Sequence, residues 1–533
     1  MASCGKNFDH NENLTVFRYN EPANITSLDP AFARNQANIW ATSQLYNSLL
    51  RLDENLNVVN DLAKKYSISE DGLTYTFLLR NDVFFHDNPC FENGIGRKVT
   101  AHDFVYSFNR LLEPSLNSPG TWVMNQVARK PDGKLDVEAT NDSILVINLK
   151  EPFPPMAGLL TMQYCSAVAR EAMVMYGQDF RKNPVGTGPF MFKYWKEGVK
   201  LVFRKNENYF EFDDEGNRLP YLDAVSITFI IDRQTAFLEF VKGNLDFLTS
   251  VDASYKDDIL TPDGSLQPRY KDKFKMIKKP FLNTEYLGIM VNPDNLPTDW
   301  PLKKKAVRQA INYGFDRAKM IRYLRNDVGI PAHGGFVPVG MPGFHENEGG
   351  YSYNPDLARQ LLAKAGYPGG AGLPVITLKT NQNYLDIAQF LQHELSRLGI
   401  RIAIDVMPPA TLRETVAKGE ADFFRASWIA DYPDAENFLA LFYSPNQSPA
   451  GPNYTHFSNQ KFDQLYKKSI TTTDDKKRQG IYRQMDKIVV DEAPVVFLFY
   501  DQSVRFFDIN IKGLSNNPLN HLDLRRARFE ISR

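Results

Sequence analysis

The stretch of residues 375–428 alternates β-rich and helical patterns, and this order limits the folds that the chain can adopt. Strand patterns cover 375–380, 400–406 and 422–428, and helical patterns cover 385–398 and 410–418. A β-α-β-α-β order favours a parallel sheet with right-handed crossovers. Ligands of such sheets bind beyond the carboxyl ends of the strands. Asp431, which follows the third strand, is therefore a candidate cleft residue; a turn aspartate ahead of Pro433 is the alternative.

The length of the chain predicts more than one hydrophobic core. With 533 residues, we expect two or three domains or one large discontinuous body. The other patterned segments are of both kinds: strands are expected at 74–80, 142–150 and 223–232, and helices at 100–112, 302–324 and 354–365. The fold class is therefore α/β.

Charge and hydropathy exclude two classes of function. The chain has 62 basic and 63 acidic residues, whereas nucleic-acid binding requires a basic face. No apolar run approaches the roughly 18–20 residues that span a bilayer. The composition, 43% hydrophobic and 23% charged, is that of a soluble globular protein.

Signatures of catalysis and metal binding are missing from the sequence. There is no GxSxG elbow, no phosphate loop ending in GK[ST] and no CxxC. His393 and Glu394 begin like a zinc-protease helix, but Arg397 stands where the second histidine is needed. We therefore expect no enzyme, no cofactor and no metal. The alternative is a hydrolase that uses Asp431, Asp434 and Glu436 as its acid and base.

The three cysteines allow two interpretations. Residues 1–4, Met-Ala-Ser-Cys, end like a bacterial lipoprotein signal, and the polar residues up to 13 are typical of a flexible tether. If Cys4 carries lipid, Cys90 and Cys165 remain as a pair. They form either a disulfide in an oxidising compartment or two separate buried thiols.

Several segments together resemble the peptide-binding branch of the solute-binding proteins of family 5, which serve ABC importers. The resemblance rests on segments in the family's order: LAKKYSISEDGLTYTFLLRNDVFFHD at 62–87, VTAHD at 99–103, GTGPF at 186–190, VRQAINYGFDR at 307–317, NPDLARQLLAKAG at 354–366 and SWIADYPDAENF at 427–438. It runs from about residue 14 to the C-terminus. The departures are Asn88, where the family usually has glycine, and an apparent insertion at 89–96.

The resemblance implies a three-lobed periplasmic-binding-protein-like fold (type II, cluster C) with mixed sheets. Two of its lobes are hinged around a buried ligand cleft. On this sequence the implied division is a tether at 1–13, a discontinuous lobe I at 14–46, 186–279 and 501–533, lobe II at 47–185 and lobe III at 280–500. The chain crosses between lobes I and III near Pro280 and Tyr500, so we expect the hinge there.

The resemblance also implies a set of ligand-binding residues. Asp431 matches the family's ammonium-binding aspartate, and residues 427–430 could supply an edge strand to a peptide backbone. The expected site, all from this sequence, comprises Arg425, Ser427, Trp428, Ile429, Ala430, Asp431, Tyr432, Asn35, Gln36, Ala37, Gln382 and Asn383. Residues 381–384 lack the arginine of dipeptide-type members, which argues against strict dipeptide recognition. Arg425 matches an arginine available to longer peptides; an internal salt bridge is its alternative.

The implied function is capture of peptides, most simply oligopeptides, and their delivery to the permease subunits of an ABC importer. We expect a monomer in the periplasm or at the outer face of a membrane, anchored through Cys4. Two alternatives stay open. The same fold could bind another solute, such as a nickel complex, haem or an oligosaccharide, or the chain could be a surface sensor or hydrolase outside transport.

Overall fold

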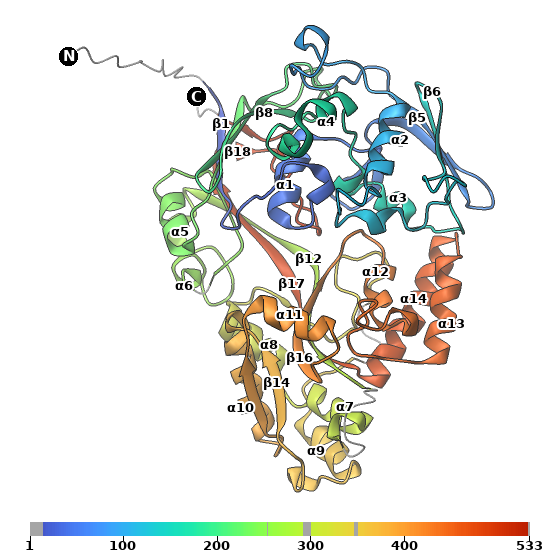
Figure 1. Ribbon diagram of the computed structural model, residues 1–533. Helices are drawn as coiled ribbons and strands as arrows, with labels where there is room; N and C mark the ends of the chain where they lie inside the picture. Colours follow the sequence, from blue (N-terminus) through green and yellow to red (C-terminus); the bar gives the residue numbers. More distant parts are fainter. Residues whose placement is uncertain (1–13, 253, 292–299, 346–349, 531–533) are drawn as a thin grey trace.

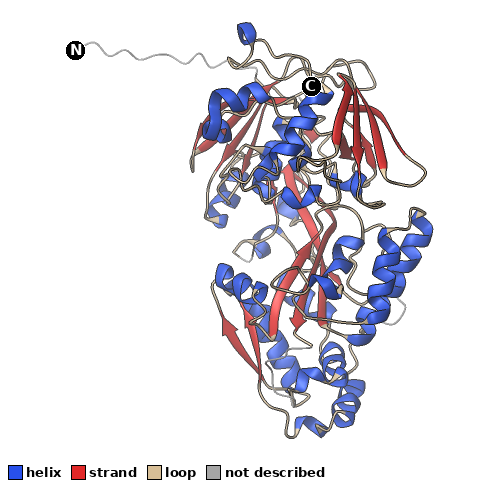
Figure 2. Cartoon of the chain, turned by 45° about the vertical axis from the view of Figure 1, so that its right-hand side comes forward, coloured by secondary structure: helices blue, strands red, loops and turns tan. Residues whose placement is uncertain are grey.

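The protein consists of an upper and a lower body joined by two long strands (Figure 1). The computed structural model describes residues 14–252, 254–291, 300–345 and 350–530. The joining strands are β12 (Phe274–Ile289) and β17 (Val495–Asp508). Because both strands run through the two bodies, one hydrogen-bonded sheet extends across the whole molecule (Figure 2).

This sheet is mixed, as the sequence predicted. In the lower body it holds β15 (Ile402–Val406), β14 (Ile376–Thr380) and β16 (Phe423–Ile429), and β14 is parallel to both of its neighbours. The strand order β15-β14-β16 therefore confirms the predicted parallel β-α-β-α-β unit. Its crossovers are α10 (Leu385–Ser396) and α11 (Pro409–Ala417). On its other side β16 is antiparallel to β12.

The upper part of the same sheet contains a second parallel group. β1 (Val16–Asn20) is parallel to β10 (Ala224–Thr228) and to β11 (Phe247–Thr249), and β11 joins β17. β9 (Lys200–Lys205) and β8 (Phe190–Lys196) complete that end. β10 is shorter than the strand predicted at 223–232. Asp232 caps the helix α5 (Arg233–Val241), so Ile231 is 81% exposed instead of lying on the strand's apolar face.

A separate antiparallel sheet covers the right-hand side of the upper body in Figure 1. Its order is β4-β5-β7-β6, with bounds Ala63–Ile68, Thr74–Leu79, Ile144–Asn148 and Val137–Asn141. Helix α2 (Ala101–Arg110) packs on β6 and β7. Thr100 and Asp103 form the capping box that starts this helix. Two of the predicted strands and one predicted helix are thus confirmed within a few residues.

The lower body is mostly helical around its part of the sheet. Its remaining helices are α7 (Lys305–Tyr313), α8 (Arg317–Arg325), α9 (Pro355–Lys364), α12 (Glu436–Leu439), α13 (Gln460–Ile470) and α14 (Asp475–Glu492). The helical stretch predicted at 302–324 is divided into the two helices α7 and α8. The chain turns at Gly314 and starts again at Asp316, whose carboxylate accepts the backbone N–H of Lys319 and caps α8.

The hydrophobic cores follow the two bodies. One buried cluster takes residues from every segment of the upper body, including Phe17, Phe77, Phe190 and Leu524. A second cluster fills the lower body. Leu56, at the turn between β2 (Leu50–Leu52) and β3 (Val58–Asn60), is an exception, because it belongs to the upper body yet packs in the lower cluster. The upper segments therefore share this main core, with a smaller separate cluster that includes Phe237, Phe240 and Phe274, while the lower body has its own core.

The two strands that join the bodies have a break in their pairing. The β12–β17 ladder is regular from Phe274 to Pro280 and resumes only at Thr284, opposite Tyr500. Such irregularities bend a strand and interrupt its hydrogen bonding. The break coincides with the position where the sequence predicts a hinge, although the lobe boundaries themselves remain predictions.

Two simpler expectations concern the cysteines and the membrane. Cys90 and Cys165 are free thiols, so the disulfide alternative was wrong. Within the described ranges no helix is long and apolar enough to cross a bilayer. Cys4 and the tether lie outside the described residues.

We predict that the ion pair between Asp29 and Arg110 stabilises the upper body strongly. Both side chains are about 5% exposed or less, and two hydrogen bonds of 3.0 and 2.6 Å join them. Arg110→Ala leaves a buried unpaired carboxylate, so we expect a loss of roughly 3–5 kcal/mol in the free energy of unfolding, measured by urea denaturation. Arg359→Ala, which breaks an exposed pair with Asp356, should cost at most about 1 kcal/mol. Equal losses in the two variants would contradict the prediction.

Candidate functional site

Asp431 lies where the sequence predicts, just past the carboxyl end of β16 at the edge of the lower body. Its carboxylate accepts a hydrogen bond of 3.3 Å from Asn437, and within the described part of the chain no cation lies at ion-pair distance. Its side chain is exposed to solvent, while the protein atoms around it disfavour the charged form of the carboxyl and raise its pKa. It therefore presents an uncompensated carboxylate to the space between the bodies.

The upper body faces Asp431 with Tyr164 and Arg34. Burial, with a smaller contribution from the charge of Asp431, raises the pKa of Tyr164 to about 12, while the charge of Arg34 opposes the rise. The charges of Asp431 on the lower body and Arg34 on the upper body thus both affect the pKa of Tyr164. These groups belong to opposite walls of the same space.

Asn437 in α12 positions the Asp431 loop, and the sequence analysis missed it. Its side-chain oxygen accepts the backbone N–H of Asp431 at 3.1 Å and the indole N–H of Trp428 at 3.0 Å. Trp428, a predicted site residue, is therefore held by this bond and packs against the lower core. The only signal for Asn437 in the sequence is its place in the same DYPDAEN segment.

The loop continues into a buried acidic cluster. Glu436 is 4% exposed and accepts hydrogen bonds from the hydroxyls of Tyr432 and Tyr466. Asp434 pairs with Arg478 at 3.4 Å. Burial raises the pKa of both carboxyls. Because both oxygens of Glu436 are occupied by tyrosines, it is not free to act as an acid or base on a ligand, unlike Asp431.

Tyr432 joins the two bodies. Its ring contacts Trp122 of the upper body at a centroid distance of 6.4 Å, and it packs into the upper hydrophobic core. Gly158 lies against it, since a Cβ there would be 3.6 Å from the Tyr432 Cβ. Tyr432, the residue after Asp431, therefore makes a direct contact between the two bodies.

β16 has one open side beside the site. β12 pairs with it from Asn283 to Ile289, but β14 bridges it only at Phe424. Ala430 donates its N–H to Leu282 on the β12 side at 2.8 Å, and backbone groups alternate along a strand. The N–H and C=O groups of Ser427 and Ile429 therefore point to the unpaired side. A peptide backbone could pair there as an added strand.

Arg425, another predicted site residue, has its charge compensated. Its guanidinium forms an ion pair with Glu285, which is nearly fully buried, and lies 3.2 Å from the ring centroid of Tyr384. The internal salt bridge that was its alternative is present. Gln382 and Asn383 are exposed beside it, in the short turn after β14. Together they border the open side of β16.

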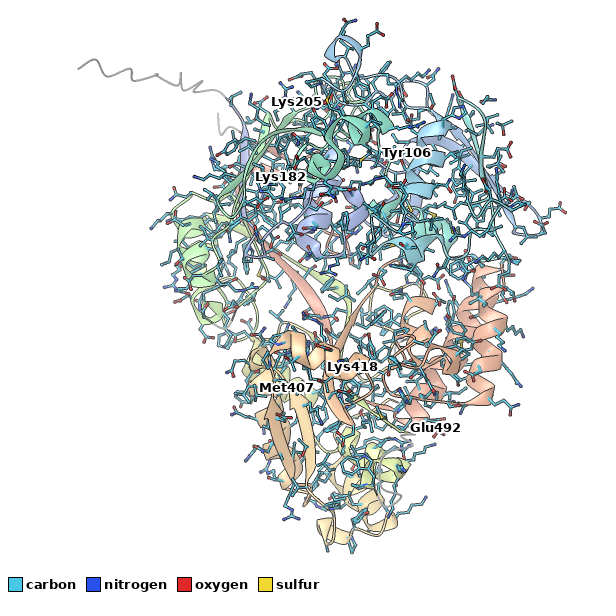
Figure 3. The ribbon with its side chains drawn as sticks, in the orientation of Figure 1. Tyr106, Lys182, Lys205, Met407, Lys418 and Glu492 are labelled. Atoms are coloured by element: carbon cyan, nitrogen blue, oxygen red, sulfur yellow. The ribbon has the colours of Figure 1, made fainter. Side chains whose placement is uncertain are left out.

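Three predicted residues lie on the upper body. Asn35 caps α1 (Gln36–Leu45) by accepting the N–H of Asn38 at 3.0 Å. Asn35, Gln36 and Ala37 line a cavity of about 530 Å³ together with Phe281 and Asp501 of the joining strands. Met407 and Lys418, labelled in Figure 3, lie just before and just after α11 on the lower body. This cavity thus joins the three upper-body residues to the strands between the bodies, whereas the predicted residues of the lower body do not line it.

The comparisons with known proteins agree on the family. Residues 57–450 match the model for the middle part of bacterial extracellular solute-binding proteins, family 5. The chain is 27% identical to heme-binding protein A of Haemophilus influenzae over 90% of this chain and 86% of that protein. It is 25% identical to the dipeptide-binding protein of Escherichia coli K12, over 89% and 87% of the two chains.

Solved structures show that the fold is the same. The periplasmic binding protein DppA of Helicobacter pylori, in complex with the peptide STSA, matches with a TM-score of 0.76 at 24% identity, over 96% of this chain and 98% of that one. The substrate-binding protein CtaP of Listeria monocytogenes matches with a TM-score of 0.81 at 22% identity, over 97% and 99%. The predicted periplasmic-binding-protein-like fold is therefore confirmed.

We predict that Glu436 makes the stability of the protein pH-dependent. Its pKa is raised by burial, with Asp434 and Asp431 adding to the rise and the two tyrosines opposing it. The fold therefore favours the protonated acid, and its contribution is full below the unfolded value of 4.5 and declines as the pH rises. Each tenfold difference between the acid dissociation constants of a group in the folded and unfolded states changes the free energy of unfolding by about 1.4 kcal/mol.

The test compares the parent with Glu436→Gln, which cannot ionise, by urea unfolding at several pH values. The parent should lose stability relative to the variant as the pH rises above 4.5. Glu414→Gln is the control, because its bond to Lys418 lowers the pKa of Glu414 and gives the opposite sign. A difference between parent and Glu436→Gln that does not change with pH would contradict the assignment.

Proposed function

This chain belongs to the bacterial extracellular solute-binding proteins of family 5, and we propose that the solute it captures is a peptide. We propose further that the peptide is an oligopeptide, which the chain passes to the permease subunits of an ABC importer. The relatives named above are binding proteins, which supports a role in binding and not in catalysis.

The proposal depends on two features that lie next to each other, the carboxylate of Asp431 and the open side of β16. A peptide has an ammonium group at one end and a row of backbone donors and acceptors behind it. Enclosing it removes water, so each of these groups needs a partner. Asp431 offers an uncompensated carboxylate, and Ser427 and Ile429 offer unpaired backbone groups directly before it. This order of groups fits the amino-terminal end of a peptide.

The residues that border the open side of β16 support a ligand longer than a dipeptide. The turn at 382–384 has no basic residue, and the nearby Arg425 is already paired with Glu285. A carboxylate close behind the ammonium group would therefore meet no basic residue in this turn. A longer peptide places its carboxylate elsewhere, and Arg425 could serve it only by exchanging Glu285 for the ligand.

We also propose where the protein acts and how it moves. It works as a monomer outside the cytoplasm, in a periplasm or on the outer face of a membrane, and a lipid on Cys4 anchors it. One lipid chain gives only reversible attachment, so stable anchoring needs two acyl chains. The lower body closes on the upper body about the break in β12 and β17, between lobes with the boundaries that the family resemblance implies.

We predict that a bound peptide makes the molecule more compact. A ligand that contacts both walls favours the closed arrangement, because only there does it gain both sets of contacts. Small-angle scattering of the full chain should give a smaller radius of gyration with a saturating peptide mixture than without it. An unchanged radius under conditions where binding is measured independently would contradict closure.

We predict that Asp431 binds the ammonium group of the peptide. Asp431→Asn keeps the size of the side chain and removes its charge. Loss of one partner of an enclosed charge pair costs roughly 2–5 kcal/mol, which is about a 30-fold to several-thousand-fold loss of affinity in calorimetry. An N-acetylated peptide removes the charge from the ligand side, so the two losses should be far from additive.

Glu420→Gln provides a matched control for this experiment. Glu420 is an exposed carboxylate just before the opposite end of β16, and its removal should leave the affinity nearly unchanged. Additive losses in the cycle, or an Asp431→Asn protein that binds free and acetylated peptides as the parent does, would show that Asp431 only shapes its loop. Binding of haem or sugars but of no peptide would contradict the proposed ligand class.

A further inference from the structure

The upper body has its own cavity at the ends of parallel strands. β10, β1 and β11 are parallel neighbours, and the residues at and just after their carboxyl ends, Asn20 and Glu21, Ile231, and Thr249 and Ser250, line a cavity of about 530 Å³. Ligands tend to bind beyond the carboxyl ends of such strands, and on this basis Asp431 was predicted to be a site residue on the lower body. The same tendency applies equally to this cavity.

Glu21 is the one lining carboxylate whose charge has no partner within the described residues. It is 8% exposed, and its Oε1 accepts the N–H of Ala23 at 3.0 Å. Burial raises the pKa of Glu21 to about 7, with that N–H and the charge of Arg233 opposing the rise. The charge of Arg233 is thus too weak to offset the effect of burial on this carboxyl.

The other charged groups around the cavity are compensated. Arg233 lies 3.4 Å from Asp252, and Asp501 lies 2.7 Å from Arg325. The polar lining otherwise consists of neutral side chains, including Asn20, Asn35, Gln36, Gln502 and Ser503. With a pKa of about 7, Glu21 is only partly ionised near neutral pH, and a cationic occupant of the cavity would stabilise its charged form.

The cavity also adjoins both the hinge and the predicted site. Phe281, Asp501 and Gln502 line it at the break in the β12–β17 ladder. Leu282, the residue after Phe281, accepts the N–H of Ala430 at the start of the Asp431 loop. Asn35, Gln36 and Ala37 belong to the same lining. A group held in this cavity therefore touches the upper body and the strands that lead to the lower body at once.

We propose that Glu21 forms a second ligand subsite, which binds an ammonium or guanidinium group on a side chain of the peptide. The inference rests on the proposed function and narrows it to peptides with a lysine or arginine at one defined position. The ligand cation supplies the positive charge that Glu21 lacks. The cavity volume lies within the range of small-molecule sites, so it accommodates a long basic side chain.

The test uses tetra-alanine peptides that carry either lysine or norleucine at each position in turn, measured by calorimetry on the full chain. Norleucine keeps the aliphatic stem and lacks the ammonium group. At one position, the parent should bind the lysine peptide about 10- to 100-fold more tightly than the norleucine peptide. In Glu21→Gln, which retains the acceptor for Ala23, that preference should fall to about threefold or less.

Glu239→Gln makes the same charge change on α5 at a carboxylate outside the cavity lining, and it should keep the full preference for lysine. If the parent binds all the peptides without any lysine preference, or if the preference survives in Glu21→Gln, the subsite is contradicted while the proposed function stands. If no peptide of the set binds the parent, the proposed function fails, and the subsite fails with it.

Discussion

The architecture depends on one pair of strands, β12 and β17, which carry the chain between the two bodies in opposite directions. Their pairing makes a single sheet out of strands from both bodies, so the bodies cannot separate without breaking that ladder. The ladder is already interrupted between Pro280 and Thr284. The upper segments share one main hydrophobic core and the lower body has another, which supports the proposal that relative movement concentrates at this interruption.

Each body presents the carboxyl ends of parallel strands to the space between them. On the lower body these ends carry Asp431, and on the upper body they carry Glu21. Loops at such ends are not constrained by strand pairing, and they can place charged groups without disturbing the sheet. Two carboxylates without cation partners among the described residues, one on each wall, make the space suitable for a ligand that brings its own positive charges.

The contacts near Asp431 explain why its loop is fixed. Asn437 holds the loop through the backbone of Asp431 and the indole of Trp428. A hydrogen bond from the hydroxyl of Tyr432 to Glu436 fixes the residues after Asp431, and the ring of Tyr432 contacts Trp122 of the upper body. Leu56 makes a comparable contact from the upper body into the lower core with a φ of 65°, a backbone conformation that costs a leucine energy. The bodies therefore meet at defined points in addition to the two joining strands.

Local patterns in the sequence predicted the parallel unit and, through it, the place of Asp431. They did not predict the pairing of Arg425 with Glu285, because those residues are far apart in sequence and meet only through the β12–β16 ladder. The split at Gly314 was missed because the helical pattern continues through it, and the capping role of Asp316 emerges only from the fold. Glu21 gave no signal in the sequence, because its place in a cavity depends on the fold bringing the ends of β1, β10 and β11 together.

The central claim, that this space encloses a peptide with a free amino terminus, is tested most directly by native mass spectrometry of the full chain after incubation with a peptide digest and desalting. The account predicts retained peptides that fragment as sequences with free amino termini; retention of haem, a nickel complex or an oligosaccharide in place of any peptide would contradict it.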